Sequence, residues 1–293
     1  MAPLPSTPPS GAPRVLLIDV DGTMVGRVSC AACQFDLLRL TGASKGKRMA
    51  ALKEDLVARL KHGIVRPHLD AFCKHAAAAG VEMFVYTASD PGWAAFIVPC
   101  IETALGIKFN RPLFTRAHCV PVSAGGGSVE YRKSIARVLP QVFSRLRRKH
   151  GLRTSKDLRD RIVLVDNTPN IVVDAAEAAR VVTCPTYDYN YVFDVLSHLD
   201  VNALHRRVGL SRIAPVLVRY GLLPPSAAAS PPATYQHLVQ PYYERLARAI
   251  AEAGPANLAA LSTDRFWYAF WHALAPRRAF DDDGVRALQR AVR

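Results

Sequence analysis

The chain has 293 residues, half of them hydrophobic, which is enough to bury the core of one ample domain or two modest ones. No stretch approaches the ~18 apolar residues of a membrane-spanning helix. Residues 1–13 lack the basic and apolar regions of a secretory signal, and six scattered cysteines fit a reducing compartment. Composition therefore excludes a membrane-embedded protein and predicts an intracellular one, cytoplasmic or nuclear.

The first predicted element is a buried strand that follows a flexible N-terminal segment rich in proline and serine. Residues 15–18, Val-Leu-Leu-Ile, form the short aliphatic run typical of a parallel strand, and Gly22 ends it. Asp19 and Asp21 therefore lie where the strand opens into a loop. In open α/β sheets this is the place where ligands bind.

The next stretch, from about residue 33 to residue 62, has helical periodicity with a break at 42–47, and we predict that it forms a small cap over the site. A calcium loop before it is disfavoured, because the twelfth position counted from Asp19 is Cys30 rather than Glu. Cys30 and Cys33 form a CxxC pair without a second pair. Two stray thiols at a helix start are therefore favoured over a zinc or redox centre.

A second strand with a polar tip is predicted in the middle of the chain. A helix over 68–79 leads into a strand over 81–86, which ends in Thr87-Ala88-Ser89, and another helix is predicted over 93–105. The glycine-rich loop at 123–128 lacks the Gly-Lys-Ser/Thr sequence of a nucleotide-binding loop. We interpret it as a flexible connection within a small insertion.

A third strand, over 161–165, follows a helix over 132–149 and runs into Asp166-Asn167-Thr168-Pro169. A helix over 170–179 and a strand over 180–184 complete the alternation. Strands that alternate with helices predict an α/β fold with a parallel sheet and helices on both of its faces.

Part of the net charge of +14 is concentrated in one segment, which we call the basic stripe 145–161. A smaller basic cluster lies at 45–48. A solvated helix face and a surface for an anionic partner, either nucleic acid or an acidic phosphorylated peptide, are equally supported interpretations. Because the stripe directly precedes the strand that ends in Asp166, we expect it to lie beside the polar strand ends.

The C-terminal part is predicted to be helical. We divide the chain into the flexible segment 1–13, an α/β domain over 14–221, a Pro/Ala/Ser linker over 222–233 and a helical extension over 234–293. Four aromatic residues of the extension share one helix face, which is expected to pack on the α/β domain or to form a homo-oligomer contact: Phe266, Trp267, Phe270 and Trp271. The acidic run 281–283 predicts a helix N-terminus rather than a metal site.

Four motifs occur in an order that resembles the haloacid dehalogenase superfamily. They are Asp19-Val20-Asp21-Gly22-Thr23, Thr87-Ala88-Ser89, the lysine of Glu130-Tyr131-Arg132-Lys133, and Asp166-Asn167-Thr168-Pro169. Within the superfamily the chain is most similar to the phosphatases of the RNA polymerase II C-terminal domain, the NLI-interacting-factor-like group, over about 14–196. The resemblance implies a haloacid-dehalogenase-like, Rossmannoid sheet and a phosphatase activity. Gly22 is a departure, because polymerase-tail phosphatases usually carry an acid there.

The chemistry of phosphate esters gives each motif a role. A phosphate dianion repels an anionic nucleophile, so a carboxylate can attack it only where a cation and a lysine balance the charge. Asp19 is the expected nucleophile, and Asp21 is expected to protonate the leaving alkoxide and then to activate water. Thr87 is expected to bind a phosphoryl oxygen through its hydroxyl and backbone amide, with Ala88 beside it, and Lys133 is expected to hold another oxygen.

Mg²⁺ suits the remaining oxygen ligands, which are Asp19, the backbone carbonyl of Asp21, and Asp166 or Asn167. The resemblance implies that the amide ligates the metal directly while the acid lies beside metal and lysine. Lys156 competes with Lys133 for the role of the active-site lysine, although the sequence around Lys133 fits the family better.

We therefore predict a Mg²⁺-dependent phosphatase that acts on phosphoserine or phosphothreonine in a protein such as a polymerase tail. One alternative is a phosphatase of nucleotides or nucleic-acid ends that holds its polymer on the basic stripe. The other is an inactive scaffold that binds phosphoprotein or nucleic acid, which the presence of all the motif residues disfavours.

Overall fold

The structure is a computed structural model that describes residues 13–42, 46–124, 129–197, 199, 208–230, 232–277 and 280–292. The chain divides into two compact units. The first, here called the sheet unit, comprises Met1–Val25, Val65–Tyr187 and Asp264–Arg293, and the second, the helical unit, comprises Gly26–Ile64 and Asp188–Thr263. Both units are therefore built from segments that are distant in the sequence.

The sheet unit contains five parallel strands in the order β3-β2-β1-β6-β7. This confirms the predicted α/β fold. The strands are β1 (Val15–Ile18), β2 (Glu82–Tyr86), β3 (Asn110–Phe114), β6 (Ile162–Asp166) and β7 (Val181–Thr183). The three central strands, β2, β1 and β6, are buried at every position, which explains why they lack the alternation of an exposed strand.

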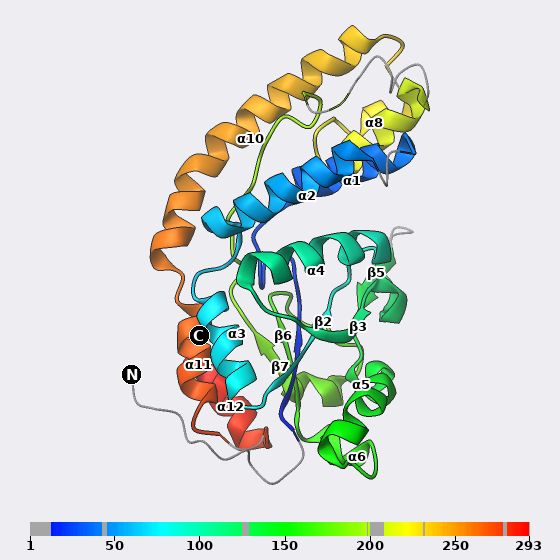
Figure 1. The fold of residues 1–293 in the computed structure, drawn as a ribbon. Coiled ribbons are helices and arrows are strands. Elements are labelled where there is room, and N and C mark those ends of the chain that lie inside the picture. Colours follow the sequence, from blue (N-terminus) through cyan, green and yellow to red (C-terminus); the bar gives the residue numbers. More distant parts are fainter. Residues whose placement is uncertain are drawn as a thin grey trace. The chain divides into compact units, whose positions relative to one another are not determined.

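Helices cover the sheet on opposite sides, as Figure 1 shows for α3 (Leu69–Ala78) and α5 (Ile135–His150). The buried face of α5 packs on alternate residues of the central strands, through Val138, Val142 and Leu146. Before α5, β4 (Val120–Ser123) and β5 (Val129–Arg132) form an antiparallel hairpin. The glycine-rich loop predicted within this insertion lies, from residue 125 to residue 128, outside the described residues.

The sheet unit also contains the α-helices α4 (Pro91–Leu105), α6 (Lys156–Arg159), α11 (Phe266–Leu274) and α12 (Asp282–Ala291). The aromatic face of α11 packs on α3, where the Phe72 ring lies 4.5 Å from the Trp267 ring and 5.5 Å from the Phe270 ring. This confirms the prediction that the aromatic face packs on the α/β domain. The Asp281 side chain accepts the Gly284 N–H, so the acidic run is the predicted helix cap.

The helical unit contains α1 (Ser29–Leu40), α2 (Lys47–Arg59), α8 (Leu210–Arg219), α9 (Ser226–Ala229) and α10 (Tyr235–Thr263). Cys30 and Cys33 are both buried at the start of α1, and burial raises the pKa of each thiol. Asp194 accepts the hydroxyls of Tyr242 and Tyr243 and so fastens α10 to the preceding segment. Among the described helices, α10 included, none is both long and apolar enough to cross a bilayer.

One local prediction was wrong, and a second segment contains a helical turn that the sequence did not indicate. The segment predicted as a helix over 170–179 contains only a 3-10 turn at Ala175–Arg180. The backbone before it is used elsewhere, because Ile171 accepts the Lys133 N–H and the Val173 N–H donates to Lys133. In the predicted linker, residues Ser226–Ala229 form a helical turn, α9, since three consecutive alanines offset the effect of the flanking prolines.

Candidate active site

The site lies where three neighbouring strands end. Ile18 of β1 is in register with Val85 of β2 and Val165 of β6, so the residues that follow these three positions share one edge of the sheet. Asp19 directly follows β1 and Asp166 is the last residue of β6. Burial of the strands therefore fixes the positions of polar side chains that lie far apart in the sequence.

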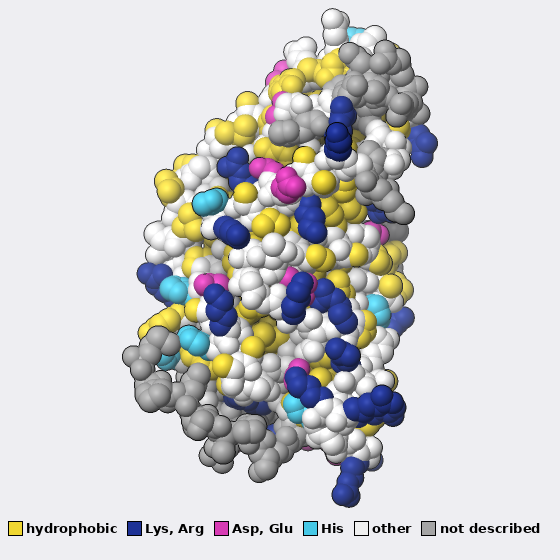
Figure 2. All heavy atoms as spheres, in the orientation of Figure 1, with side chains coloured by type: hydrophobic (Ala, Val, Ile, Leu, Met, Phe, Trp, Pro, Cys, Tyr) yellow, Lys and Arg dark blue, Asp and Glu magenta, His cyan; other side chains and the backbone are white. Residues whose placement is uncertain are grey.

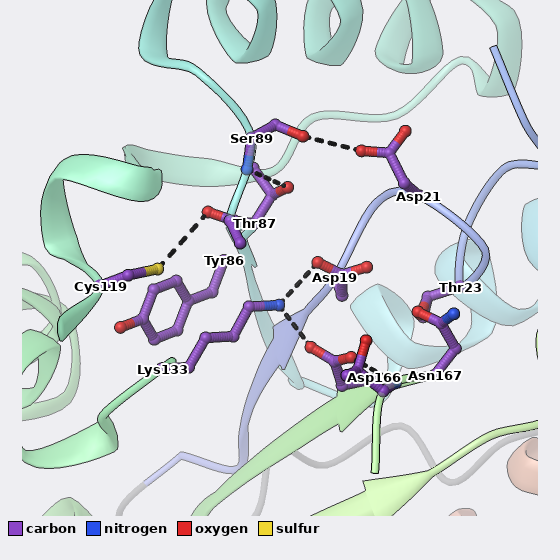
Figure 3. A network of polar contacts seen from close by, with 12 residues as sticks. Asp19, Asp21, Thr23, Tyr86, Thr87, Ser89, Cys119, Lys133, Asp166 and Asn167 are labelled. Atoms are coloured by element: carbon purple, nitrogen blue, oxygen red, sulfur yellow. Dashed lines mark hydrogen bonds and ion pairs between the residues drawn. The ribbon is translucent and has the colours of Figure 1, made fainter. Parts of the chain in front are cut away.

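Lys133 joins the two carboxylates. Its Nζ lies 2.6 Å from Asp19 Oδ1 and 2.5 Å from Asp166 Oδ2, and the lysine side chain is 1% exposed. Figure 3 shows it reaching between the two acids from the segment that follows the hairpin. Lys156, the competing lysine, is exposed at the start of α6. The structure thus brings Lys133, and not Lys156, to Asp19 and Asp166.

Lys133, Asp19 and Asp166, here called the charged triad, are all buried, and burial determines their electrostatics. Desolvation raises the pKa of Asp19 to about 7, and the neighbouring carboxylates add to the rise, although Lys133 opposes it. Burial alone would lower the pKa of Lys133, but the charges and hydrogen bonds of Asp19 and Asp166 outweigh burial and raise it. One ammonium group therefore serves two carboxylates, and a further cation would favour the ionised form of Asp19.

Asp21 points away from the triad toward the end of β2 (Figure 3). Its Oδ2 accepts a hydrogen bond of 2.8 Å from the Ser89 hydroxyl, and burial raises its pKa while that hydrogen bond lowers it. Gly22 makes the turn after Asp21 with φ +75, and a Cβ built there would lie 2.6 Å from Asn167 Nδ2. The glycine that departs from the polymerase-tail pattern is therefore required by the backbone and by the close approach of Asn167.

Thr87 and Ala88 differ from the prediction in one respect. The Thr87 backbone N–H donates to the carbonyl of Phe114 in β3, so it is used by the sheet and does not face the site. Its hydroxyl oxygen accepts the Ser89 N–H at 3.1 Å, which leaves the hydroxyl proton free to be donated. The Ala88 N–H has no hydrogen bond within the described residues. We therefore correct the expected phosphate donors to the Thr87 hydroxyl and the Ala88 N–H.

Asn167 faces a different set of groups from Asp166. Its Oδ1 accepts the Thr23 hydroxyl at 3.2 Å, and its Nδ2 donates to Thr186 at 3.1 Å. Asp166 instead contacts Lys133 through one oxygen and accepts the Thr168 N–H through the other. Both side chains flank the end of β6, with the acid on the lysine side.

The sequence analysis included Ser89 in the Thr-Ala-Ser motif without giving it a role, and it assigned no role to Tyr86. The Tyr86 hydroxyl accepts the Ser134 N–H at 3.0 Å and donates to the His118 carbonyl at 3.0 Å, which anchors the segment that carries Lys133. Lys133 Nζ lies 5.4 Å from the centre of the Tyr86 ring. A tyrosine at the end of an apolar strand resembles a core residue, so its contacts with distant segments were not predictable.

The oxygen donors at the strand ends fit a hard divalent cation. The second oxygen of Asp19 has no hydrogen bond within the described residues, and Asp166, Asn167 and the backbone carbonyl of Asp21 offer further oxygens. No group of three or more His, Cys, Asp or Glu side chains that could hold a metal occurs in the described part of the chain. A cation here would therefore need carbonyl, amide, water or phosphate oxygens, which suits Mg²⁺.

Comparison with known proteins gives a family match and similar solved structures, of which two are described here. The model of a family described as NLI interacting factor-like phosphatase matches residues 14–202. The structure of Fcp1, described as an essential RNA polymerase II CTD phosphatase, is 15% identical, with a TM-score of 0.35, over 90% of this chain and 64% of that chain. A fission yeast Fcp1 variant bound to beryllium fluoride is 12% identical, with a TM-score of 0.33, over 82% of this chain and 63% of that chain. The chain thus spans less than two thirds of each, and no curated protein matches it.

Proposed function

Because the chain belongs to the NLI interacting factor-like phosphatases of the haloacid dehalogenase superfamily, we propose that it is an active, Mg²⁺-dependent phosphatase that forms an aspartyl-phosphate. The observation that carries the proposal is the contact of Lys133 with both Asp19 and Asp166 at the strand ends. Burying a lysine and two carboxylates carries a desolvation cost, and a phosphoryl group is an anion that such a lysine can hold.

The proposed reaction has two steps. In the first, Asp19 attacks phosphorus, the bond between phosphorus and the ester oxygen breaks, and Asp21 gives its proton to the leaving oxygen. In the second, Asp21 takes a proton from water, the water oxygen attacks phosphorus, and the bond to Asp19 breaks to release inorganic phosphate. Lys133, the Thr87 hydroxyl and the Ala88 N–H hold the phosphoryl oxygens throughout.

Asp19, the carbonyl of Asp21, and Asp166 or Asn167 are the residues that would hold Mg²⁺. When bound, the cation supplies positive charge that favours the ionised form of Asp19 and balances the phosphate dianion. Asn167 is oriented toward Thr23, and Asp166 is oriented toward Lys133. These orientations support an arrangement in which the two residues approach the cation from different sides.

For the substrate, we propose phosphoserine or phosphothreonine in a protein, as in the polymerase-tail phosphatases whose Thr-Ala-Ser and Asp-Asn motifs the chain resembles. Turnover of p-nitrophenyl phosphate with and without Mg²⁺ tests the enzyme against the scaffold alternative. We expect Mg²⁺-dependent turnover that Asp19→Asn abolishes, together with an acid-stable, hydroxylamine-labile phosphate on the wild-type chain. A properly folded wild-type protein that shows neither would overturn the proposal.

A second experiment separates the two enzyme alternatives. The purified protein is given a phosphoserine peptide and a 3′-phosphorylated oligonucleotide at equal concentrations, and released phosphate is measured. We expect a higher kcat/KM on the peptide. Preference for the oligonucleotide would favour the nucleic-acid-end phosphatase instead.

The position of the basic stripe 145–161 corrects one expectation. Helix α5 begins beside Lys133 and ends beside Glu82, the first residue of β2, to which Lys149 and His150 both bind. The end of α5 therefore lies at the amino-terminal ends of the strands, whereas the candidate site lies at their carboxyl-terminal ends. The two are roughly 15 Å apart along a five-residue strand. The stripe does not lie beside the strand ends, because α5 runs antiparallel to the strands.

The basic stripe nevertheless supports a separate surface for an anionic polymer. Figure 2 shows Lys and Arg side chains gathered over the region of α5 and α6. Five exposed cations there have no ion pair within the described residues: Arg145, Arg147, Arg148, Arg153 and Lys156. Arginine forks match phosphate oxygens, so nucleic acid is the partner that we propose for this surface, independently of the phosphatase reaction.

A further inference from the structure

Asp21, the group that is to protonate the leaving alkoxide, has one side-chain hydrogen-bond partner among the residues that the structure describes. Ser89 Oγ donates to Asp21 Oδ2 at 2.8 Å, whereas Asp21 Oδ1 has no hydrogen bond within the described residues. Figure 3 shows the Asp21 carboxylate turned toward Ser89 and away from Lys133. The rotamer of Asp21 is therefore fixed at one oxygen, and the other oxygen remains available for a proton.

Ser89 is itself held firmly by its backbone. Its N–H donates to Thr87 Oγ1 at 3.1 Å, and its carbonyl accepts the Arg116 N–H at 3.0 Å. Arg116 Nε also donates to the Ala88 carbonyl at 2.8 Å. The segment after β2 is thus tied at both ends, so the Ser89 hydroxyl is presented to Asp21 from a fixed position.

The same residue also orients the hydroxyl of Thr87. Because Thr87 Oγ1 accepts the Ser89 N–H, its own proton is free to be donated to a phosphoryl oxygen. One residue thus connects the group that binds phosphate with the group that protonates the leaving oxygen.

We infer that Ser89 is a positioning residue for the leaving-group step, which orients Asp21 so that Oδ1 faces the ester oxygen. The inference rests on the proposed phosphatase function, which it deepens. A hydrogen bond to a charged group contributes about 1.5–3 kcal/mol, which corresponds to about 10- to 150-fold in rate if it is fully lost in the transition state.

The test compares leaving groups. Wild-type protein and Ser89→Ala are given a series of substituted phenyl phosphates, from 4-nitrophenyl to phenyl and 4-methoxyphenyl phosphate, and kcat/KM is measured for each with Mg²⁺ present. A 4-nitrophenolate ion leaves without much help, whereas the poorer leaving groups need a proton. We expect Ser89→Ala to lose about 10-fold or more on the poor leaving groups and less than about 3-fold on 4-nitrophenyl phosphate, on the scale of one charged hydrogen bond.

Two variants complete the test. Ser89→Thr keeps the hydroxyl and is expected to restore the shallow wild-type dependence on the leaving group. Ser155→Ala is the control variant. It removes a hydroxyl of the sheet unit that makes no helix-capping hydrogen bond, and it is expected to leave every kcat/KM unchanged.

The outcomes separate this inference from the function on which it rests. An equal loss on every phenyl phosphate, no loss at all, or no recovery in Ser89→Thr would overturn the positioning role while leaving the phosphatase intact. Wild-type protein that hydrolyses no member of the series would overturn both.

Discussion

Asp19 and Asp166 share one ammonium group, so the site holds more negative charge than its buried lysine balances. Desolvation raises the pKa of Asp19 to about 7, which means that the ionised nucleophile is costly at neutral pH unless a second cation approaches. A cation that binds at this site should therefore stabilise the folded protein, because it offsets the uncompensated negative charge.

We expect Mg²⁺ to raise the thermal stability of the wild-type protein, measured by scanning calorimetry. A ligand that binds only the folded state stabilises it by about 2.7 kcal/mol at 100 times its Kd. Asp166→Asn should lose most of this shift, and Asp160→Asn, at an exposed carboxylate that pairs with Arg180, should keep it. Equal shifts in both variants would place the ion elsewhere.

Asp21→Asn removes the proton donor but keeps the side chain's size and one oxygen for Ser89. We expect kcat on a phosphoserine peptide to fall by ~10²–10⁴-fold, the usual contribution of general acid-base catalysis. Steady-state kinetics at saturating Mg²⁺ measures it. An unchanged kcat would remove Asp21 from the acid-base role.

Glu82 offers a pH-dependent test of stability away from the site. Burial alone would raise the pKa of Glu82, but hydrogen bonds from Lys149, Asn110 and His150 outweigh burial and lower it. A carboxyl whose folded pKa is depressed stabilises the fold above its unfolded pKa of about 4.3, and this contribution is lost as the pH falls through the folded pKa.

We therefore expect Glu82→Gln to be less stable than wild type above about pH 5, and the difference to shrink below about pH 4. Urea unfolding across this range measures the difference. The exposed Glu54→Gln is the control and should show little difference at any pH. A Glu82→Gln deficit that persists unchanged at pH 3 would contradict the assignment.

At the scale of elements, the C-terminal helices are part of the sheet unit although α10 separates them from it in sequence. Arg14 donates to the carbonyls of Leu274 and Arg277, and Gln289 of α12 donates to Val181 of β7. Arg66, 1% exposed, forms an ion pair of 2.8 Å with Asp264 and lies over the Phe266 ring. The start of α11 is therefore fixed by a buried charge pair as well as by aromatic packing.

Removing one member of this pair should be costly because it leaves Arg66 buried and unpaired. We expect Asp264→Asn to lower the free energy of unfolding by about 3–5 kcal/mol, as for other broken buried pairs. The double variant Arg66→Met/Asp264→Leu should lose less. Urea denaturation measures both variants.

The exposed pair of Arg27 and Asp188, whose side chains are 62% and 60% exposed, provides the matched control. Asp188→Asn should cost less than about 1 kcal/mol. If Asp264→Asn cost no more than this control, the Arg66 pair would not be what holds α11.

The elements show which parts of the fold and the site the sequence could predict. Each of Asp19, Thr87 and Asp166 directly follows or ends a buried apolar run, and a parallel sheet brings such positions to one edge. The expected motif residues could therefore be selected from local patterns alone. The contacts of Tyr86 and Ser89 could not be predicted in this way, because their hydrogen bonds join segments that lie 48 and 68 residues apart.

The failed helix prediction over 170–179 has a comparable cause. Helical propensity is a local property, whereas the backbone of residues 171–173 is used to pair with Lys133. A tertiary contact that holds the lysine thus outweighs the local preference of the segment. The direction of α5 could not be read from the sequence either, which is why the basic stripe was expected at the wrong edge of the sheet.

At the scale of the whole molecule, each compact unit is assembled from segments distant in sequence. The domain boundaries expected at 221 and 233 remain a prediction. The charge of the chain is likewise distributed over both units. A net charge of +14 attracts any polyanion to some extent. A specific role for the basic stripe therefore requires a comparison at equal net charge.

We expect the triple variant Arg145→Gln/Arg147→Gln/Arg148→Gln to weaken binding to single-stranded RNA more than Lys53→Gln/Lys61→Gln/Arg248→Gln, which removes the same charge from exposed positions of the helical unit. Fluorescence anisotropy at several salt concentrations measures both. Each lost phosphate contact lowers the slope of log K against log salt by about 0.7, so the stripe variant should lose about 2 from its slope and the control variant little. Turnover provides the second readout of the same variants. Because the stripe lies at the opposite ends of the strands from Asp19, kcat/KM on p-nitrophenyl phosphate should stay unchanged in both variants.

Equal losses of RNA affinity would mean that the stripe attracts RNA only through the net charge of the chain. Lost turnover in the stripe variant would contradict its separation from the site.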